Sequence, residues 1–145
     1  MARLLVVESY PALATVVGIA LERSGHDVHR VGSLQRALEL EDHFDLTVLD
    51  IDLADGSGVN LAGLLLDEGR SDRVVFYTAN DDAALREHAE QLGPLVTKEI
   101  GIEPLLIAVH DELKITDSAK VVGASDQPWL QRRSGRSGTR RRVPK

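Results

Sequence analysis

The 145-residue sequence predicts an α/β fold built on a doubly wound, five-stranded parallel sheet. Five short aliphatic runs alternate with segments of helical periodicity through the first 113 residues. The middle runs are apolar at consecutive positions, which is typical of strands that are buried on both faces. The chain is 43% hydrophobic and 28% charged. This composition supplies one sizeable core, and the chain is too short for two full domains.

The five expected strands are runs of aliphatic and β-branched residues. They cover Leu4–Val7, Val28–Val31, Leu46–Leu49, Val74–Tyr77 and Leu95–Val96. Because helical segments separate these runs, right-handed crossovers make the strands parallel. The carboxyl ends of the strands then meet at one edge of the sheet, where the functional crevice of such folds lies.

A helix is expected after each strand. The first, Pro11–Ser24, has proline in its first turn and is followed by Gly25 as a stop signal. The second begins after the capping residue Ser33. The other three are predicted by apolar residues that recur at helical spacing. They are expected at Val59–Glu68, at Asp81–Leu92 and at about Pro104–Leu113.

Several classes of protein are excluded by what the sequence lacks. The chain contains no cysteine, which excludes disulfide scaffolds, zinc–thiolate sites and cysteine nucleophiles. No apolar segment approaches the about 18 residues of a membrane span, and the first residues do not have a signal-peptide pattern. We therefore expect a cytoplasmic protein without a membrane partner. The sequence leaves the oligomeric state open between a monomer and a weak dimer.

Charge divides the chain into two parts. Residues 1–113 hold 8 Lys and Arg against 21 Asp and Glu, a net charge of −13, whereas residues 114–145 hold 9 against 2, a net charge of +7. The sequence predicts a folded domain over residues 1–115 and a disordered, Arg/Gly/Ser-rich tail over residues 116–145, too short for an output domain. Nucleic acid is an expected partner of the tail only, which could alternatively bind the acidic surface of its own domain.

Residues that can carry chemistry follow four of the predicted strands. Glu8 and Ser9 follow the first strand, Asp50 the third, Thr78 the fourth and Lys98 the fifth. A carboxylate at the tip of a central strand can act as a nucleophile toward a phosphoryl group. Glu8 and Asp50 could share Mg²⁺, which prefers oxygen ligands. Lys98 could pair with the phosphoryl oxygens, and Thr78 could hydrogen-bond the product.

Four segments of the sequence resemble motifs of one known family, the receiver domains of two-component response regulators. The segments are LLVVES–YPAL, TVLDIDLADGSG, VVFYTA and LVTKE, and the resemblance covers roughly residues 3–113. It implies a flavodoxin-like, CheY-like (βα)5 fold. It also implies phosphorylation of Asp50 by a histidine kinase or phosphotransfer protein and output through contacts with a downstream protein. Bound Mg²⁺ is implied as well, held here by Glu8, Asp50 and Asp52.

The sequence departs from the family pattern at several positions. Ser9 stands where the family has a second acidic metal ligand. Since a hydroxyl is a weaker ligand for a hard cation, we expect a weakened Mg²⁺ site. Glu99 follows Lys98 where the family has proline, and Leu95 stands where the family has its switch aromatic residue.

Each candidate residue also has a simpler structural interpretation. Asp50 could be an ordinary strand-end carboxylate, and Lys98 a surface lysine. Ser9 is most simply a cap or turn residue at the start of the first helix. Asp52 and Asn80 either tune the lifetime of the phosphoryl group, as the resemblance implies, or are plain loop residues. The five histidines lie singly, without the spacing of metal ligands, and are expected to be structural or solvated.

We expect a single-domain response regulator whose chemistry is limited to self-phosphorylation and slow dephosphorylation, and not an enzyme with an external substrate. One alternative is a pseudo-receiver that binds partners without phosphorylation, supported by Ser9, Leu95 and Glu99. Another is a phosphatase of the haloacid-dehalogenase type, because Asp50 and Asp52 resemble its nucleophile and acid/base pair. The acidic pair that such a phosphatase has after the lysine is missing. A third alternative is a nucleic-acid-binding protein that acts through the basic tail.

Overall fold

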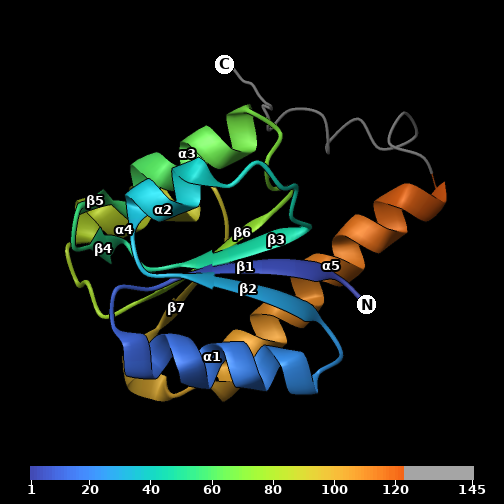
Figure 1. The fold of residues 1–145 in the computed structure, drawn as a ribbon, viewed down its shortest axis with the longest axis horizontal. Helices are drawn as coiled ribbons and strands as arrows, with labels where there is room; N and C mark the ends of the chain where they lie inside the picture. Colours follow the sequence, from blue (N-terminus) through green and yellow to red (C-terminus); the bar gives the residue numbers. More distant parts are fainter. Residues whose placement is uncertain (123–145) are drawn as a thin grey trace.

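The computed structural model describes the backbone of residues 1–122 and the side chains of residues 1–114. Five strands form one parallel sheet in the order β2-β1-β3-β6-β7 (Figure 1). Their bounds are β1 Arg3–Val7, β2 Asp27–Val31, β3 Leu46–Leu49, β6 Val74–Thr78 and β7 Leu95–Thr97. The predicted doubly wound sheet is confirmed, and each strand agrees with its predicted limits to within about one residue.

Five α-helices accompany the sheet. They are α1 Pro11–Arg23, α2 Leu34–Glu39, α3 Gly58–Asp67, α4 Ala83–Glu90 and α5 Glu103–Val122. Ser33, Ser57 and Asp82 are the N-cap residues of α2, α3 and α4, and each side chain accepts a backbone amide of the first turn. Such caps satisfy amides that have no partner inside the helix, which explains why these helices begin where they do.

The last helix is longer than the apolar pattern predicts. α5 continues past Leu113 to Val122, so that residues 116–122 of the predicted tail are helical. A helix propagates easily once it has nucleated, and neither Gly nor Pro occurs between Leu113 and Val122. The rest of the predicted disordered tail, residues 123–145, lies outside the described residues.

Helices cover both faces of the sheet, with α2, α3 and α4 on one face and α1 and α5 on the other (Figure 1). The side chains of β1 alternate between the two cores, as the two-residue period of a strand requires. Leu5 and Val7 pack under α2 and α3, whereas Leu4 and Val6 pack against α1 and α5. The central strands β1, β3 and β6 are therefore buried on both sides, whereas the edge strand β2 is partly exposed. The rigid centre of the sheet holds the residues at its carboxyl edge in place.

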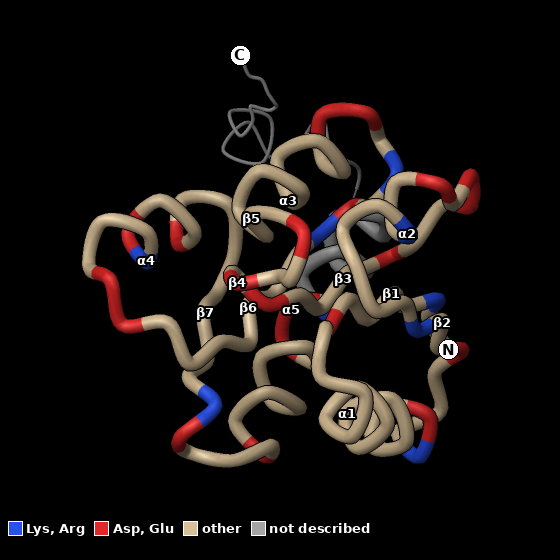
Figure 2. Tube along the Cα trace, turned by 60° about the vertical axis from the view of Figure 1, so that its left-hand side comes forward, with Lys and Arg blue, Asp and Glu red and all other residues tan. Residues whose placement is uncertain are grey.

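The surface of the domain is acidic. Figure 2 shows Asp and Glu along the loops around β4 (Asp52–Leu53) and ahead of α4, with few Lys and Arg among them. A surface with this negative charge repels the phosphate backbone of a nucleic acid. Among residues 1–122, no helix has both the length and the apolarity needed to cross a membrane.

Candidate functional site

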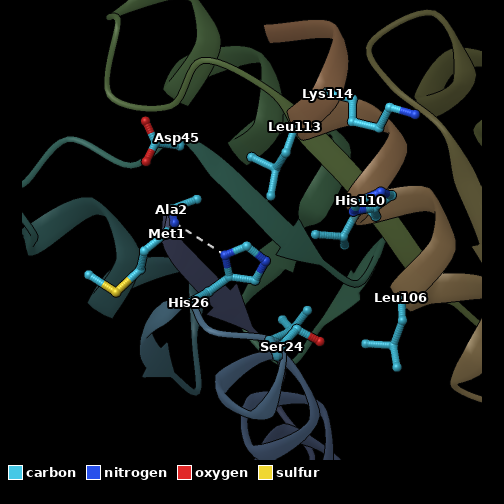
Figure 3. A pocket seen from close by; sticks show the side chains of 11 residues that line it. Met1, Ala2, Ser24, His26, Asp45, Leu106, His110, Leu113 and Lys114 are labelled. Atoms are coloured by element: carbon cyan, nitrogen blue, oxygen red, sulfur yellow. Dashed lines mark hydrogen bonds between the residues drawn. The ribbon is translucent and has the colours of Figure 1, made fainter. Parts of the chain in front are cut away.

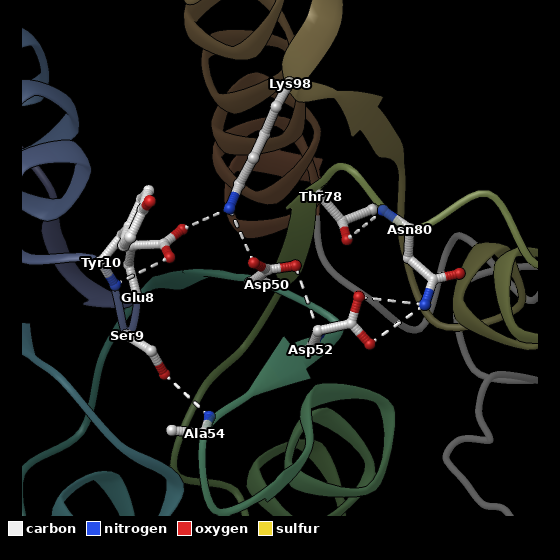
Figure 4. A network of polar contacts seen from close by, with 9 residues as sticks. All are labelled: Glu8, Ser9, Tyr10, Asp50, Asp52, Ala54, Thr78, Asn80 and Lys98. Carbon is white, nitrogen blue, oxygen red and sulfur yellow. Dashed lines mark hydrogen bonds and ion pairs between the residues drawn. The ribbon is translucent and has the colours of Figure 1, made fainter.

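The carboxyl edge of the sheet brings four predicted site residues together (Figure 4). Glu8 follows β1, Asp50 follows β3, Thr78 is the last residue of β6, and Lys98 begins the 3₁₀ turn η1 (Lys98–Ile100) directly after β7. Parallel pairing of β1, β3, β6 and β7 places these strand ends side by side. Glu8 and Asp50 are each 6% exposed, so two carboxylates lie largely buried at this edge.

Lys98 forms ion pairs with both of these carboxylates. Its Nζ lies 2.7 Å from Asp50 Oδ2 and 3.0 Å from Glu8 Oε1. Burial alone would lower the pKa of Lys98, but the hydrogen bonds and negative charges of Asp50 and Glu8 outweigh it and raise the pKa above its usual value. A raised folded-state pKa means that this stabilisation is complete below the ordinary lysine pKa and is lost only as pH rises through the folded-state value.

A second set of contacts joins the loop after β3 to the loop after β6. Asp50 Oδ1 accepts the backbone amide of Asp52 at 3.2 Å. Both carboxylate oxygens of Asp52 accept the side-chain amide of Asn80 at 3.0 Å. The backbone amide of Asn80 donates to the hydroxyl oxygen of Thr78 at 3.1 Å. The side chains of Asp52 and Asn80 thus connect the segment after β3 to the loop after β6.

Ser9 does not cap the first helix. The N-cap residue of α1 is Tyr10, whose side chain makes no capping hydrogen bond. Ser9 Oγ instead accepts the backbone amide of Ala54 at 2.9 Å, across the loop that follows β3. In Figure 4 its side chain lies toward Ala54 and away from Lys98. The interpretation of Ser9 as a helix cap is wrong, because its hydroxyl oxygen accepts the backbone amide of Ala54 and not an amide in the first turn of α1.

The loop after β3 is also tied to α2, through a residue that sequence reasoning missed. β4 (Asp52–Leu53) pairs with β5 (Gly56–Ser57) in a small hairpin, and Asp55 lies at its turn. The Asp55 carboxylate accepts the backbone amides of Gln35 at 3.0 Å and Leu34 at 2.9 Å. These hydrogen bonds lower the pKa of Asp55. An aspartate in a turn gives no sequence signal that its partner is a helix some twenty residues earlier.

Gly58 is the second residue whose role only the structure reveals. Its backbone amide donates to the Ile51 carbonyl at 2.7 Å. A Cβ atom at Gly58 would lie 1.8 Å from the carbonyl oxygen of Asp50. The first turn of α3 therefore approaches the backbone of Asp50 so closely that only glycine fits.

The side chains at this edge are of the chemical type that a hard divalent cation prefers. Glu8, Asp50 and Asp52 supply three carboxylates, and Mg²⁺ is commonly held by one or two carboxylates together with water. Ser9 Oγ is engaged with Ala54 and does not join this set. The ammonium group of Lys98 lies between two of the carboxylates and would compete with the cation.

The comparison with protein families decides what kind of domain carries this site. Residues 4–125 match the response regulator receiver domain family. The chain belongs to this family. The membership connects it to two-component signalling and confirms the resemblance that the four sequence motifs predict. Receiver domains are not a classical enzyme family, which argues against the phosphatase alternative.

Solved receiver domains share the fold. A Francisella response regulator receiver domain has a TM-score of 0.71 at 22% identity, covering 80% of this chain and 99% of its own. The response regulator TrrA from Thermotoga maritima, solved in complex with Mg²⁺–BeF, has a TM-score of 0.68 at 22% identity, with coverages of 77% and 99%. The non-phosphorylated HemR receiver domain from Leptospira biflexa has a TM-score of 0.69 at 26% identity, with coverages of 78% and 94%. Among curated protein sequences, no significant match is found.

This receiver domain also has a concavity of about 430 Å³ at the opposite, amino-terminal edge of its sheet (Figure 3). Its lining includes four titratable side chains: His26, Asp45, His110 and Lys114. The residues that the sequence predicts for phosphoryl transfer do not line it. His26 Nδ1 accepts the backbone amide of Ala2 at 3.2 Å, which requires that nitrogen to be unprotonated.

We expect His26 to make the free energy of unfolding depend on pH. Burial lowers the pKa of His26, the positive charges of the N-terminus and His110 lower it further, and Asp45 opposes them. Since the folded state disfavours the proton, the contribution of His26 to stability is complete above the ordinary histidine pKa and is lost as pH falls through it toward the folded-state value. We expect the free energy of unfolding, measured with urea at pH 7.5, 6.5 and 5.5, to fall less toward acidic pH for His26→Gln than for wild type.

The exposed His88 provides the control for this titration. His88→Gln should follow the wild-type dependence on pH. An unchanged dependence in His26→Gln would show that His26 does not carry the effect.

Proposed function

We propose that this receiver domain accepts a phosphoryl group on Asp50 from a histidine kinase or phosphotransfer protein in the cytoplasm and passes the signal on through contacts with a downstream protein. The observation that carries the proposal is the carboxylate of Asp50, at the tip of the central strand β3 and bonded to Lys98 at 2.7 Å. A buried carboxylate that faces an ammonium group is suited to become an acyl phosphate, because the cation remains to balance the charge of the phosphoryl group.

In the proposed step an oxygen of the Asp50 carboxylate attacks the phosphorus of a phosphohistidine. The new P–O bond forms as the P–N bond breaks, and the imidazole leaves with the bonding electrons. Lys98 neutralises negative charge on the phosphoryl oxygens. The Thr78 hydroxyl, whose oxygen already accepts the amide of Asn80, donates a hydrogen bond to one of those oxygens. Water later hydrolyses the acyl phosphate, which returns Asp50 to a carboxylate.

Glu8, Asp50 and Asp52 would hold Mg²⁺ in this reaction. When bound, the ion supplies additional neutralisation of the phosphoryl charge. The site is weakened relative to one with a second acid at position 9, because Ser9 is neutral and is bonded to Ala54. We therefore propose phosphorylation that needs high Mg²⁺ concentrations.

Phosphorylation by a small donor tests the proposal. Intact-mass spectrometry of the wild-type chain with acetyl phosphate and excess Mg²⁺ should show a gain of one phosphoryl group, and Asp50→Ala should show none. Asp67→Ala, which removes an exposed aspartate at the end of α3, should behave as wild type. If folded wild-type protein gains nothing, the proposal fails and the domain is a phosphorylation-independent interaction module. Steady turnover of p-nitrophenyl phosphate would instead support the phosphatase alternative.

A further inference from the structure

A cluster of one histidine and two aspartates lies at the edge of the sheet opposite to Asp50. Its members are His43 and Asp45, just before β3, and Asp72, just before β6. One ligand atom from each side chain lies within 4.8 Å of the other two. The cluster is independent of the proposed phosphoryl transfer, which uses none of these residues.

The pairing of the segments just before β3 and β6 creates this cluster. Phe44 and Ser71 form a parallel β-bridge, and both are only 2% exposed. Side chains alternate across an extended chain, so the neighbours of these two buried residues project to the other side. That alternation puts His43, Asp45 and Asp72 on the same outer side of the bridge.

The two segments of the cluster are held rigidly by backbone hydrogen bonds. The amide of Phe44 donates to the Arg70 carbonyl at 2.8 Å, and the amide of Asp72 donates to the Phe44 carbonyl at 3.1 Å. Asp45 is fixed as well, because its Oδ2 accepts the amide of Arg3 at 2.7 Å. A ligand set on a fixed backbone loses less conformational entropy when it binds an ion than a flexible set does.

We propose that His43, Asp45 and Asp72 form a second cation site, selective for a divalent transition metal of the Zn²⁺ class. His43 Nε2 lies 2.9 Å from Asp72 Oδ1. Two ligands bound to one ion at the usual metal–ligand lengths lie about 3 Å apart, so these two atoms already have the required spacing. Asp45 completes the set, because one of its carboxylate oxygens lies within 4.8 Å of the ligand atoms of the other two side chains.

The imidazole decides which class of metal the site takes. Mg²⁺ prefers oxygen ligands only, whereas Zn²⁺ and similar ions bind imidazole nitrogen together with carboxylate oxygen. With neutral His43 the three side chains carry two negative charges, which match a divalent ion. The guanidinium of Arg3 pairs with the Asp42 and Asp27 carboxylates, and that of Arg70 pairs with Glu68.

Titration of the full, tag-free chain with ZnCl₂ tests this site. Isothermal titration calorimetry in excess Mg²⁺, which occupies the carboxylates around Asp50, should give one Zn²⁺ per chain. His43→Ala should weaken binding by about tenfold or more, and Asp72→Asn should weaken it similarly. Both side chains are well exposed, 52% for His43 and 39% for Asp72, so both variants should fold. His88→Ala is the matched control and should bind as wild type.

Amide NMR spectra locate the ion independently of the affinity. Zn²⁺ should shift the signals of residues 42–46 and 70–73 in the wild type and in Asp50→Asn alike. Equal affinities for wild type, His43→Ala and His88→Ala would overturn the proposal. So would shifts confined to residues around Glu8 and Asp50, or no binding at all.

Discussion

Replacing Gly58 by alanine is expected to lower the free energy of unfolding by about 3 kcal/mol or more. The new Cβ would lie 1.8 Å from the carbonyl oxygen of Asp50 and 2.8 Å from its carbonyl carbon. Both are backbone atoms of the central strand end, so no side-chain rotation relieves the clash. The start of α3 must therefore move away from the end of β3, or the backbone of Asp50 must be displaced.

Gly63 provides a matched control in the same helix. A Cβ at Gly63 meets no atom within 4 Å, so Gly63→Ala should stabilise the domain by about 0.5–1 kcal/mol through helix propensity. Urea denaturation followed by circular dichroism measures both variants. Equal stabilities for the two would show that the close approach at Gly58 is not required.

Replacing Lys98 by methionine is expected to destabilise the domain by about 3 kcal/mol at neutral pH. The substitution keeps a long side chain but leaves two carboxylates, Glu8 and Asp50, facing each other at 6% exposure without a cation. Removing one partner of a buried charge pair typically costs about 3–5 kcal/mol. We expect a cost near the lower end of this range because the Lys98 side chain is still 19% exposed to solvent.

Two further measurements separate charge from packing at Lys98. The double variant Glu8→Gln with Lys98→Met removes one of the unpaired charges and should recover part of the loss. Added Mg²⁺ should raise the melting temperature of Lys98→Met more than that of wild type, because the competing ammonium group is gone. Lys114→Met, at an exposed position of α5, should change stability by no more than about 0.5 kcal/mol. A Lys98→Met variant as stable as Lys114→Met would contradict the charge-balancing role.

The fold could be predicted because the information for it is local. The central strands β1, β3 and β6 are short, mainly apolar runs. Residues such as Ser33 and Gly25 mark where helices start or stop. The limits of α5 could not be predicted, since residues 116–122 extend a helix beyond its apolar stripe. An apolar pattern does not predict where a helix ends when neither Gly nor Pro interrupts it.

The site could be predicted in part because strand order brings strand ends together. Glu8, Asp50 and Lys98 follow strands, and parallel pairing puts them within hydrogen-bonding distance. The contacts between loops could not be predicted. Ser9 with Ala54, and Asp52 with Asn80, depend on loop conformations that no local pattern encodes.

The cluster of His43, Asp45 and Asp72 at the opposite edge of the sheet could not be predicted from local sequence patterns either. The sequence separates His43 from Asp72 by 29 residues, and single histidines give no metal-ligand spacing. Only the bridge between Phe44 and Ser71 makes them neighbours. Residues that lie far apart in sequence can thus share a site when strand register alone brings them together.

The chemical identity of the phosphorylated residue tests the central claim most directly. Borohydride reduces an aspartyl phosphate to homoserine, so treatment of the acetyl-phosphate-modified protein followed by peptide mapping identifies the acceptor. We expect homoserine at position 50 and aspartate at positions 52 and 55. Homoserine at another position, or its absence from a folded sample in excess Mg²⁺, would contradict the assignment of Asp50 as the phosphoryl acceptor.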